Sequence, residues 1–398
     1  MQQDRAVELD AAERIDVQAV VAGQIQLRAI SINTQNDQTY NGPIRLYNDE
    51  SDLFSNNGSI NFNGTIDGDE NLYVEASNDI NLNGSVGLEQ HLARFVLTAD
   101  NGTIYLNGDG AGFIDPYVQD NYVGFTPSGS GLVVRTNGRQ EYNGPVVLGA
   151  DAELISNWSF IHFDSTVDSS FHFDPIQQQN VNDQHSLYAF ASYNHYYSGE
   201  DLFSDTVGGD WALGNLTAYS ADKLFLDGGS IQTVGDQNYY GSIRIGHQNL
   251  TLDSRNDGNG GSITFNGPVD SYENRRLSVY SDGDVTFNGS VGAAGDASYE
   301  LGSLYVELSG DNPDAMIRLN GGNSIYTDGK MEFNGPVDIN NHNAYLQSYD
   351  WRIQFDSTID SSGEYGLETY SSYGTYFYGD IGSNNPLDYL TATSVKQT

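Results

Sequence analysis

The residues best suited to chemistry in this 398-residue chain are the acidic side chains placed in Gly- and Asn-rich turns. Carboxylate oxygens in such turns are the hard ligands that Ca²⁺ prefers. The sequence contains neither a full EF-hand loop nor the nonapeptide glycine-rich calcium repeat. Two interpretations therefore stay open, solvated turn residues or weak Ca²⁺ binding. The candidate calcium ligands are Asp67, Asp69, Asp253, Asp257, Asp282 and Asp284.

Catalytic constellations are not indicated by the remaining polar residues. The seven histidines are scattered, whereas a Zn²⁺ site needs three or four ligands that converge. Paired carboxylates are used by enzymes that cleave polysaccharides, but an active site is expected to interrupt a repeat. Four of the acids instead recur at equivalent positions of the repeat: Asp67, Asp168, Asp270 and Asp360. A phosphate-binding Gly loop and a nucleophile elbow are missing too. We expect no catalytic residues, no enzyme activity and no cofactor apart from the calcium alternative.

A tyrosine-rich run supplies the candidates for ligand contact, because Tyr offers a large, rigid surface with a polar tip. They are Tyr188, Tyr193, Tyr196 and Tyr197, within a segment rich in Tyr, Phe, His, Gln and Asp. Contact with a glycan or protein is one interpretation. Packing of the segment on the flank of the fold is the other.

The composition limits the class of protein. With 16 basic and 54 acidic residues the net charge is −38, which repels nucleic acid and anionic lipid. There are no cysteines, as expected either in the cytosol or in an exported protein that stays unfolded during secretion. We find no signal-peptide pattern near Met1 and no apolar run of about 20 residues that could span a membrane.

Internal repetition is the strongest signal in the sequence. Four segments align without gaps: TQNDQTYNGPIRL, TNGRQEYNGPVVL, TVGDQNYYGSIRI and TDGKMEFNGPVDI. They begin at Thr34, Thr136, Thr233 and Thr327, so the spacings are 102, 97 and 94 residues. A second shared element, such as SINFNGTIDG or SITFNGPVDS, carries the equivalent aromatics Phe62, Phe163, Phe265 and Phe355.

The short elements predict an all-β parallel solenoid. Units such as Ile60-Asn61-Phe62 alternate apolar and polar residues, which buries one side of each strand. Asn-Gly turns follow them, since both residues tolerate a positive φ. Motifs return after about 20–24 residues, as from Gly64 to Gly84 and on to Gly108, a length that suits one solenoid coil better than hairpins or a β-sandwich array. A super-repeat of about 95–100 residues is expected to hold four or five coils.

The repeats also predict the organisation of the chain. Residues 1–33 are expected to be N-terminal coils that end a preceding repeat, and lateral insertions of a solenoid often form its binding side. The predicted segments are super-repeat 1 at 34–135, super-repeat 2 at 136–232 with an insertion at 169–211, super-repeat 3 at 233–326, and a partial super-repeat 4 at 327–398.

The order YNGPVVLGADAEL, ITFNGPVDS, LSVYSDGDVTFNGSVGA and LGSLYVEL resembles the β-strand-repeat modules of large bacterial exoproteins. These are the filamentous-haemagglutinin-like adhesins of two-partner-secretion or autotransporter type. The resemblance runs from about Ile15 to Val395. It implies a right-handed parallel β-helix, secretion to the cell surface, and a role in adhesion, biofilm or a surface coat. It brings no catalytic residues.

The sequence therefore predicts an extracellular structural or adhesive module of a bacterial surface protein: a stalk, a coat or the subunit of a filament. Its expected partners are copies of itself or further repeats stacked end to end, together with host or environmental glycans or proteins. The alternative is a polysaccharide-binding or polysaccharide-cleaving β-helix that uses the Tyr- and Asp-rich insertion.

Overall fold

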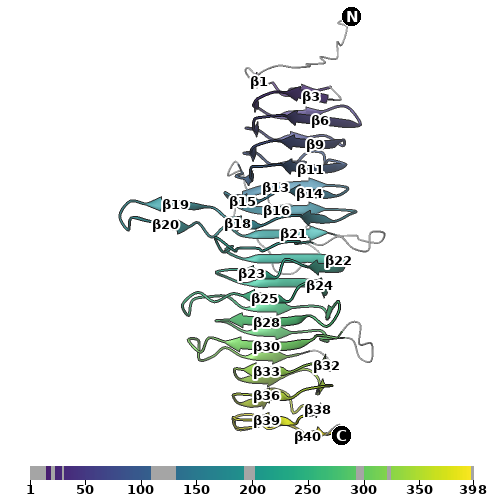
Figure 1. Cartoon of the computed structure of the whole chain (residues 1–398), viewed down its shortest axis with the longest axis vertical. Helices are drawn as coiled ribbons and strands as arrows, with labels where there is room; N and C mark the ends of the chain where they lie inside the picture. Colours follow the sequence, from purple (N-terminus) through teal and green to yellow (C-terminus); the bar gives the residue numbers. More distant parts are fainter. Residues whose placement is uncertain are drawn as a thin grey trace, which may run out of the picture. The chain divides into compact units, whose positions relative to one another are not determined.

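The structure is a computed structural model that describes residues 15–18, 23–28, 31–108, 131–191, 202–292, 300–320 and 324–395. These residues form strands, turns and loops, and no helix lies among them. The chain divides into two compact units, Met1–Ser204 and Asp205–Thr398. The pairings within each unit are parallel, except for the single antiparallel pair β19–β20 among the described strands. Both units are thus stretches of the predicted β-solenoid (Figure 1).

The first unit has three stacked sheets, which the chain visits in the order I, II, III in every coil. Sheet I contains β1 (Ile15–Gln18), β4 (Gln38–Asn41), β7 (Ile60–Phe62), β10 (Ile80–Leu82), β12 (Ile104–Leu106), β15 (Val146–Leu148) and β18 (Val167–Ser169). Sheet II contains β2 (Ile25–Leu27), β5 (Ile44–Leu46), β8 (Ile66–Asp67), a single bridge at Val86, β13 (Gly131–Thr136), β16 (Asp151–Ser156) and β21 (Leu187–Ala191). Sheet III contains β3 (Ser31–Thr34), β6 (Glu50–Ser55), β9 (Asn71–Ala76), β11 (Arg94–Ala99), β14 (Gln140–Asn143) and β17 (Ile161–Phe163).

The second unit repeats this plan with sheets IV, V and VI. Sheet IV contains the first parts of β22 (Leu216–Leu226) and β24 (Gln237–Ile245), then β26 (Ile263–Phe265), β29 (Val285–Phe287), β31 (Ile317–Leu319), β34 (Val337–Ile339) and β37 (Ile359–Ser361). Sheet V contains the second parts of β22 and β24, β27 (Val269–Ser271), a bridge at Val291, β32 (Ser324–Thr327), β35 (Ala344–Ser348), β38 (Leu367–Ser371) and β40 (Leu390–Ser394). Sheet VI contains β23 (Ser230–Gln232), β25 (Leu250–Asp253), β28 (Arg276–Ser281), β30 (Ser303–Leu308), β33 (Met331–Asn334), β36 (Ile353–Phe355) and β39 (Thr375–Phe377).

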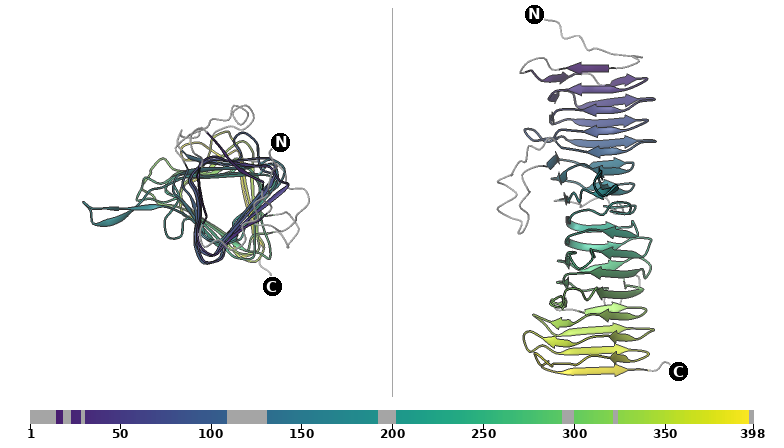
Figure 2. Two further views of the ribbon diagram at one scale, coloured as in Figure 1. Left: turned by 90° about the horizontal axis from the view of Figure 1, so that it is seen from above. Right: turned by 90° about the vertical axis from the view of Figure 1, so that its left-hand side faces the viewer.

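Alternation along the strands sends every second side chain into the coil, so that like residues stack in columns. Figure 2, seen from above, shows the interior that these columns fill. Ile60 pairs with Ile80, which in turn pairs with Ile104. The four equivalent aromatics of the repeat are all buried, and each stacks on a ring of a neighbouring coil at a centroid distance of 4.9–5.7 Å. Offset stacking at this separation stabilises aromatic pairs beyond their burial.

Three of the four aligned repeat segments, which we call anchor segments, contain a buried Gln–Tyr pair. Gln140 donates from Nε2 to the carbonyl oxygen of Ile155 at 2.8 Å, and its Oε1 accepts the hydroxyl of Tyr142 at 3.0 Å. Gln38–Tyr40 and Gln237–Tyr239 make the same hydroxyl bond at 2.7 and 2.9 Å. In the fourth anchor the pair is Met331 and Phe333, so both polar groups are replaced together. This exchange fits the rule that a buried polar group needs its partner.

The Asn-Gly turns stack rather than form hairpins. Asn83 Nδ2 donates to Asn63 Oδ1 at 2.7 Å, and Asn107 donates to Asn83 at 2.8 Å. Tolerance of a positive φ does not explain Gly64 and Gly84, because neither has a positive φ. Their requirement is close approach, because a Cβ on Gly84 would lie 2.5 Å from the carbonyl carbon of Gly64 in the preceding coil. Glycine is therefore needed for contact between coils.

The super-repeat is not a whole number of coils. From Gln38 in sheet I to Gln140 in sheet III the chain passes eleven strand positions, counting the bridge at Val86 as one. From Gln237 in sheet IV to Met331 in sheet VI it again passes eleven, counting Val291. Three positions make a coil, so each of these super-repeats has three and two-thirds coils instead of the expected four or five. Equivalent residues of successive repeats consequently lie on different sheets within a unit.

A two-stranded hairpin projects from the first unit (Figures 1 and 2). It consists of β19 (Phe171–Asp174) and β20 (Gln179–Asn182), which pair in antiparallel register. It leaves the solenoid after β18 and returns before β21, within the segment expected to be a lateral insertion. Residues 192–201 of that segment lie outside the described part of the chain.

Candidate functional site

Several acidic residues at strand ends and in turns use their carboxylates to bind backbone N–H groups of a neighbouring coil. Asp67 is buried, and its Oδ1 accepts the N–H of Glu89 at 2.7 Å. Asp360, at the equivalent position of another repeat, accepts the N–H groups of Asn384 and Asn385 at 2.9 and 3.0 Å. Burial alone would raise the pKa of Asp360, but these hydrogen bonds lower it below its ordinary value. The sequence predicts solvated turn residues here, but Asp67 lies in β8 and Asp360 in β37, and Asp67 is buried.

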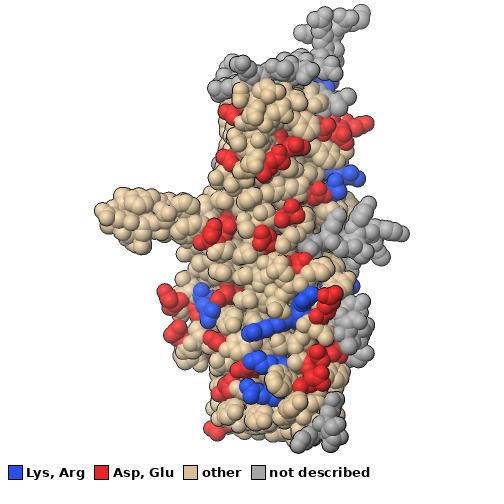
Figure 3. All heavy atoms as spheres, in the orientation of Figure 1, with Lys and Arg blue, Asp and Glu red and all other residues tan. Residues whose placement is uncertain are grey.

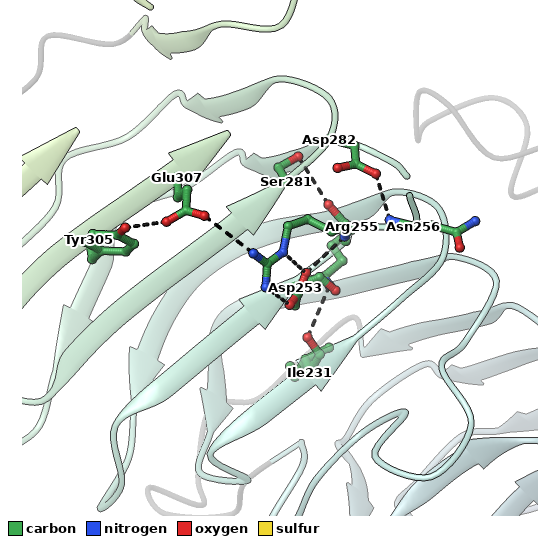
Figure 4. Close-up of polar contacts among 10 residues, drawn as sticks. Ile231, Asp253, Arg255, Asn256, Ser281, Asp282, Tyr305 and Glu307 are labelled. Carbon is green, nitrogen blue, oxygen red and sulfur yellow. Dashed lines mark hydrogen bonds and ion pairs between the residues drawn. The ribbon is translucent and has the colours of Figure 1, made fainter. Parts of the chain in front are cut away.

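Asp282 makes the most complete contact of this kind (Figure 4). Its side chain is 2% exposed, and Oδ2 accepts the N–H groups of Asn256, Gly258 and Gly260 at 2.7, 3.0 and 3.0 Å. Burial on its own would raise the pKa of Asp282. The hydrogen bonds from these amides and from the Ser309 side chain lower it instead. The carboxylate thus closes the loop that follows β25.

The other acidic candidates of the second unit bind arginines or face solvent. Asp253 accepts hydrogen bonds from Nε and Nη2 of Arg255 at 3.0 and 2.7 Å. Asp284 accepts one from Nε of Arg318 at 2.8 Å. Asp257 is exposed, with a φ of +49°. The structure does not bring these carboxylates together as one ligand shell.

Asp69 is exposed in the turn after β8, beside Glu70. The pKa of Glu70 is raised, first by burial and then by repulsion from Asp69 and Asp49. Within the described ranges, no group of three or more His, Asp or Glu side chains is arranged to hold a metal ion. Calcium binding therefore stays a prediction from the sequence.

Three histidines of the first unit lie near one carboxylate each, whereas His91 contacts the Asn157 side chain. His172 Nδ1 lies 2.6 Å from Asp183 Oδ1, while His162 and His185 lie 3.8 Å from Asp164 and Asp151. Tyr188, a ligand-contact candidate, is 4% exposed in β21, and its ring stacks on Phe190 with centroids 6.3 Å apart. The other candidates, Tyr193, Tyr196 and Tyr197, lie outside the described residues.

The hairpin β19–β20 presents apolar side chains to solvent. Phe173 is 60% exposed and Ile176, in its turn, is 92% exposed. Asp174 shapes the turn by accepting the N–H of Ile176 at 2.7 Å. At the base, Asp183 accepts the Ser170 hydroxyl at 2.6 Å, and this bond and the contact with His172 lower the pKa of Asp183, although burial alone would raise it. Hydrogen bonds thus connect residues at the turn and at the base of the hairpin, while its apolar side chains are exposed.

Four cations of the second unit lie on the outer side of sheet VI or beside it, namely Arg255, Arg276, Lys330 and Arg352. Lys and Arg form a stripe there that Asp and Glu border (Figure 3). Figure 4 shows one part, where the Arg255 guanidinium lies between Asp253 and Glu307 and reaches Glu307 at 3.5 Å. The same guanidinium lies 4.3 Å from the centre of the Tyr280 ring. Tyr305 donates its hydroxyl to Glu307, and burial, followed by this bond, raises the pKa of Tyr305 to about 12.

The sequence predicts a lateral insertion at 169–211 but not the hairpin within it, and the outer side of sheet VI was missed altogether. A signal existed for each. Residues 171–182 read FHFDPIQQQNVN, in which alternating aromatics before Asp-Pro indicate a strand and a turn. Arg276, Lys330 and Arg352 each stand at or just before the start of a strand in sheet VI. Their convergence depends on coils of unequal length, which the spacing alone does not define.

None of the described residues forms a helix of the length and apolarity needed to cross a bilayer. Comparison with protein-family models, curated proteins and solved structures gives no match for this chain.

Proposed function

We propose that this protein is an extracellular structural and adhesive β-solenoid module of a bacterial surface or secreted protein, used as a stalk, a coat or the subunit of a fibre. The observation that carries the proposal is how the polar groups are used. The Asn ladders, the amides of the buried Gln residues and the Asp–amide contacts all hold one coil to the next. Polar groups used in this way support a regular stack of coils, as a structural module requires.

The hairpin β19–β20 is proposed as the adhesive element. Between Ser170 and Ser186 there is no Lys or Arg, and the acidic residues are Asp174 and Asp183. In a chain with a net charge of −38, this segment can approach an acidic cell surface with little repulsion. Its exposed Phe173 and Ile176 can then bury apolar area against a partner.

Electron microscopy and adhesion assays test the proposal together. Purified protein is expected to give elongated particles or filaments, and beads coated with it should adhere to cells. The double variant Phe173→Ser/Ile176→Ser should keep the particle shape and lose most of the adhesion. Compact particles, or adhesion unchanged by this variant, would contradict the structural or the adhesive part respectively.

A second candidate function is polysaccharide binding or cleavage. It is favoured by the tyrosine, arginine and carboxylate side chains on the outer side of sheet VI, a combination that suits sugar hydroxyls and ring faces. A glycan array combined with a reducing-sugar assay tests it. Binding that Arg255→Ala abolishes supports this function, and the absence of both binding and product removes it.

A further inference from the structure

The outer side of sheet VI is built as three ordered columns of side chains. The register aligns Arg276 with Ser303, and its continuation aligns Lys330 with Arg352, which gives a cation column. The middle column contains Thr251, Ser278, Tyr305, Glu332, Gln354 and Tyr376. The third, the acid column, contains Asp253, Tyr280, Glu307, Asn334, Asp356 and Tyr378.

The charges of this face balance, unlike those of the chain. Its cations are those of the cation column and Arg255, and its acids are Asp253, Glu307, Asp356 and Glu332. Four of each give no net charge, whereas the whole chain carries −38. Two copies of an acidic protein repel one another over most of their surface. This face is where they can approach without that repulsion.

The cations that face solvent are held over aromatic rings. The guanidinium of Arg276 lies 5.7 Å from the centre of the Tyr305 ring, and that of Arg352 lies 6.0 Å from the Tyr376 ring. Lys330 contacts Glu332 at 2.5 Å and lies 5.8 Å from the Tyr305 ring. Tyr376 is itself 44% exposed. Arginine and tyrosine are the residue types enriched where proteins associate.

We propose that the outer side of sheet VI is a lateral interface with a second copy of this chain, in which the two sheets lie face to face with their coils stacked in the same direction. A two-fold axis along the stacking direction places the cation column of one copy opposite the acid column of the other. A two-fold axis across the stack would place cations opposite cations. The column order therefore selects the parallel arrangement.

The size of the face indicates a weak association. Six strands from β25 to β39 span about 24 Å at one strand spacing per coil, and a six-residue strand spans about 20 Å. The face then covers roughly 500 Å² per copy, at the low end for specific interfaces. Repetition along a longer array would increase the avidity. This pairing does not depend on adhesion or on end-to-end stacking.

Charge reversal tests the pairing in the full chain. One variant carries Arg276→Glu and Arg352→Glu, and the other carries Glu307→Lys and Asp356→Lys. Sedimentation velocity should show a concentration-dependent dimer for the unaltered chain and at least a tenfold weaker dimer for each variant alone. An equimolar mixture should recover the dimer, because the altered columns of the two variants face each other with opposite charge and so do their unaltered columns. Arg94→Glu/Arg139→Glu, with the same change in charge on the first unit, should leave the dimer unaffected.

Cysteine crosslinking reads the orientation without relying on affinity, since the chain has no cysteine of its own. In the parallel arrangement the middle column faces itself, so Thr251→Cys and Gln354→Cys should each form a disulfide-linked dimer. An antiparallel pair allows at most one of them. A monomeric unaltered chain, a mixture that fails to associate, or crosslinking at only one position would overturn the proposal. So would a cation column whose reversal abolishes heparin binding and leaves self-association unchanged.

Discussion

Single buried residues show why the anchor segments of the repeat look as they do. Tyr142 and Gln140 are fully buried, and each satisfies the other, while the matching positions of the fourth anchor hold Phe333 and Met331. The free energy of a buried hydrogen bond is modest, but a buried polar group left without a partner costs its full desolvation. The repeat therefore tolerates the polar pair or the apolar pair, and a mixed pair is expected to be unstable.

This argument predicts strong coupling between the two residues. Tyr142→Phe alone leaves Gln140 Oε1 without its hydroxyl donor and should lower the free energy of unfolding by about 1–3 kcal/mol. Gln140→Met alone should cost a similar amount, and the double variant clearly less than the sum of the two. Denaturant unfolding followed by circular dichroism measures the cycle.

The fourth anchor supplies the matched control in reverse. Phe333→Tyr alone places a hydroxyl against Met331 and should destabilise the second unit, whereas Phe333→Tyr/Met331→Gln should recover most of the loss. Additive effects in both cycles would contradict the idea that the pair acts as one unit.

Glycine at the Asn-Gly turn makes a second prediction at this scale. Gly84→Ala places a Cβ 2.5 Å from the backbone of Gly64, so the coils must move apart. We expect a loss of about 1–3 kcal/mol in the free energy of unfolding, in the range of overpacked sites. Gly23→Ala is the matched control, because no atom lies within 4 Å of its added Cβ. Equal midpoints for the two variants in urea would count against the close-packing explanation.

At the scale of elements, the sequence predicts the strands of a regular coil better than the contacts that join different coils. Ile60-Asn61-Phe62 shows its buried side by alternation alone, and the structure confirms it. The prediction that Asp67 is a solvated turn residue is wrong, because Asp67 is the buried last residue of β8. Its partner Glu89 belongs to another coil and cannot be inferred from local sequence. The outer columns of sheet VI were missed for the same reason, since they join residues of six coils.

The hairpin β19–β20 is expected to be dispensable for folding. Its strands pair only with each other, and its exposed tip buries little. Replacing residues 171–182 by two glycines should change the free energy of unfolding by no more than about 0.5 kcal/mol. Phe163→Ala removes a ring that stacks between Tyr142 and Phe203, and it should lower the free energy of unfolding by about 3–5 kcal/mol in the same assay. A large loss on removing the hairpin would show that it supports the coil and is not a free arm.

At the scale of the whole molecule, the distribution of charge and of buried tyrosine sets the response to pH. Most acidic residues in the described part of the chain lie outside the core, whose columns are largely apolar. The 27 tyrosines divide differently. Some, such as Tyr373 and Tyr378, are exposed, while Tyr40, Tyr142 and Tyr239 are fully buried at the anchors.

Burial raises the pKa of each of these three anchor tyrosines far above the ordinary value of about 10. A group whose pKa is raised on folding contributes stability that is fully present below its unfolded pKa and is lost as the pH rises above it. The free energy of unfolding should therefore fall above about pH 10, where an unfolded chain ionises these phenols and the folded chain does not.

Exposed tyrosines should show phenolate absorbance first, at unchanged circular dichroism. The buried ones should ionise only together with the loss of β-structure. The variant Gln140→Met/Tyr142→Phe removes one such group without leaving an unpaired partner. Between neutral and alkaline pH, its denaturant midpoint should therefore fall less than that of the unaltered chain. If all tyrosines titrate in one step before the β-signal changes, the anchors are open to solvent and the registered columns do not close around them.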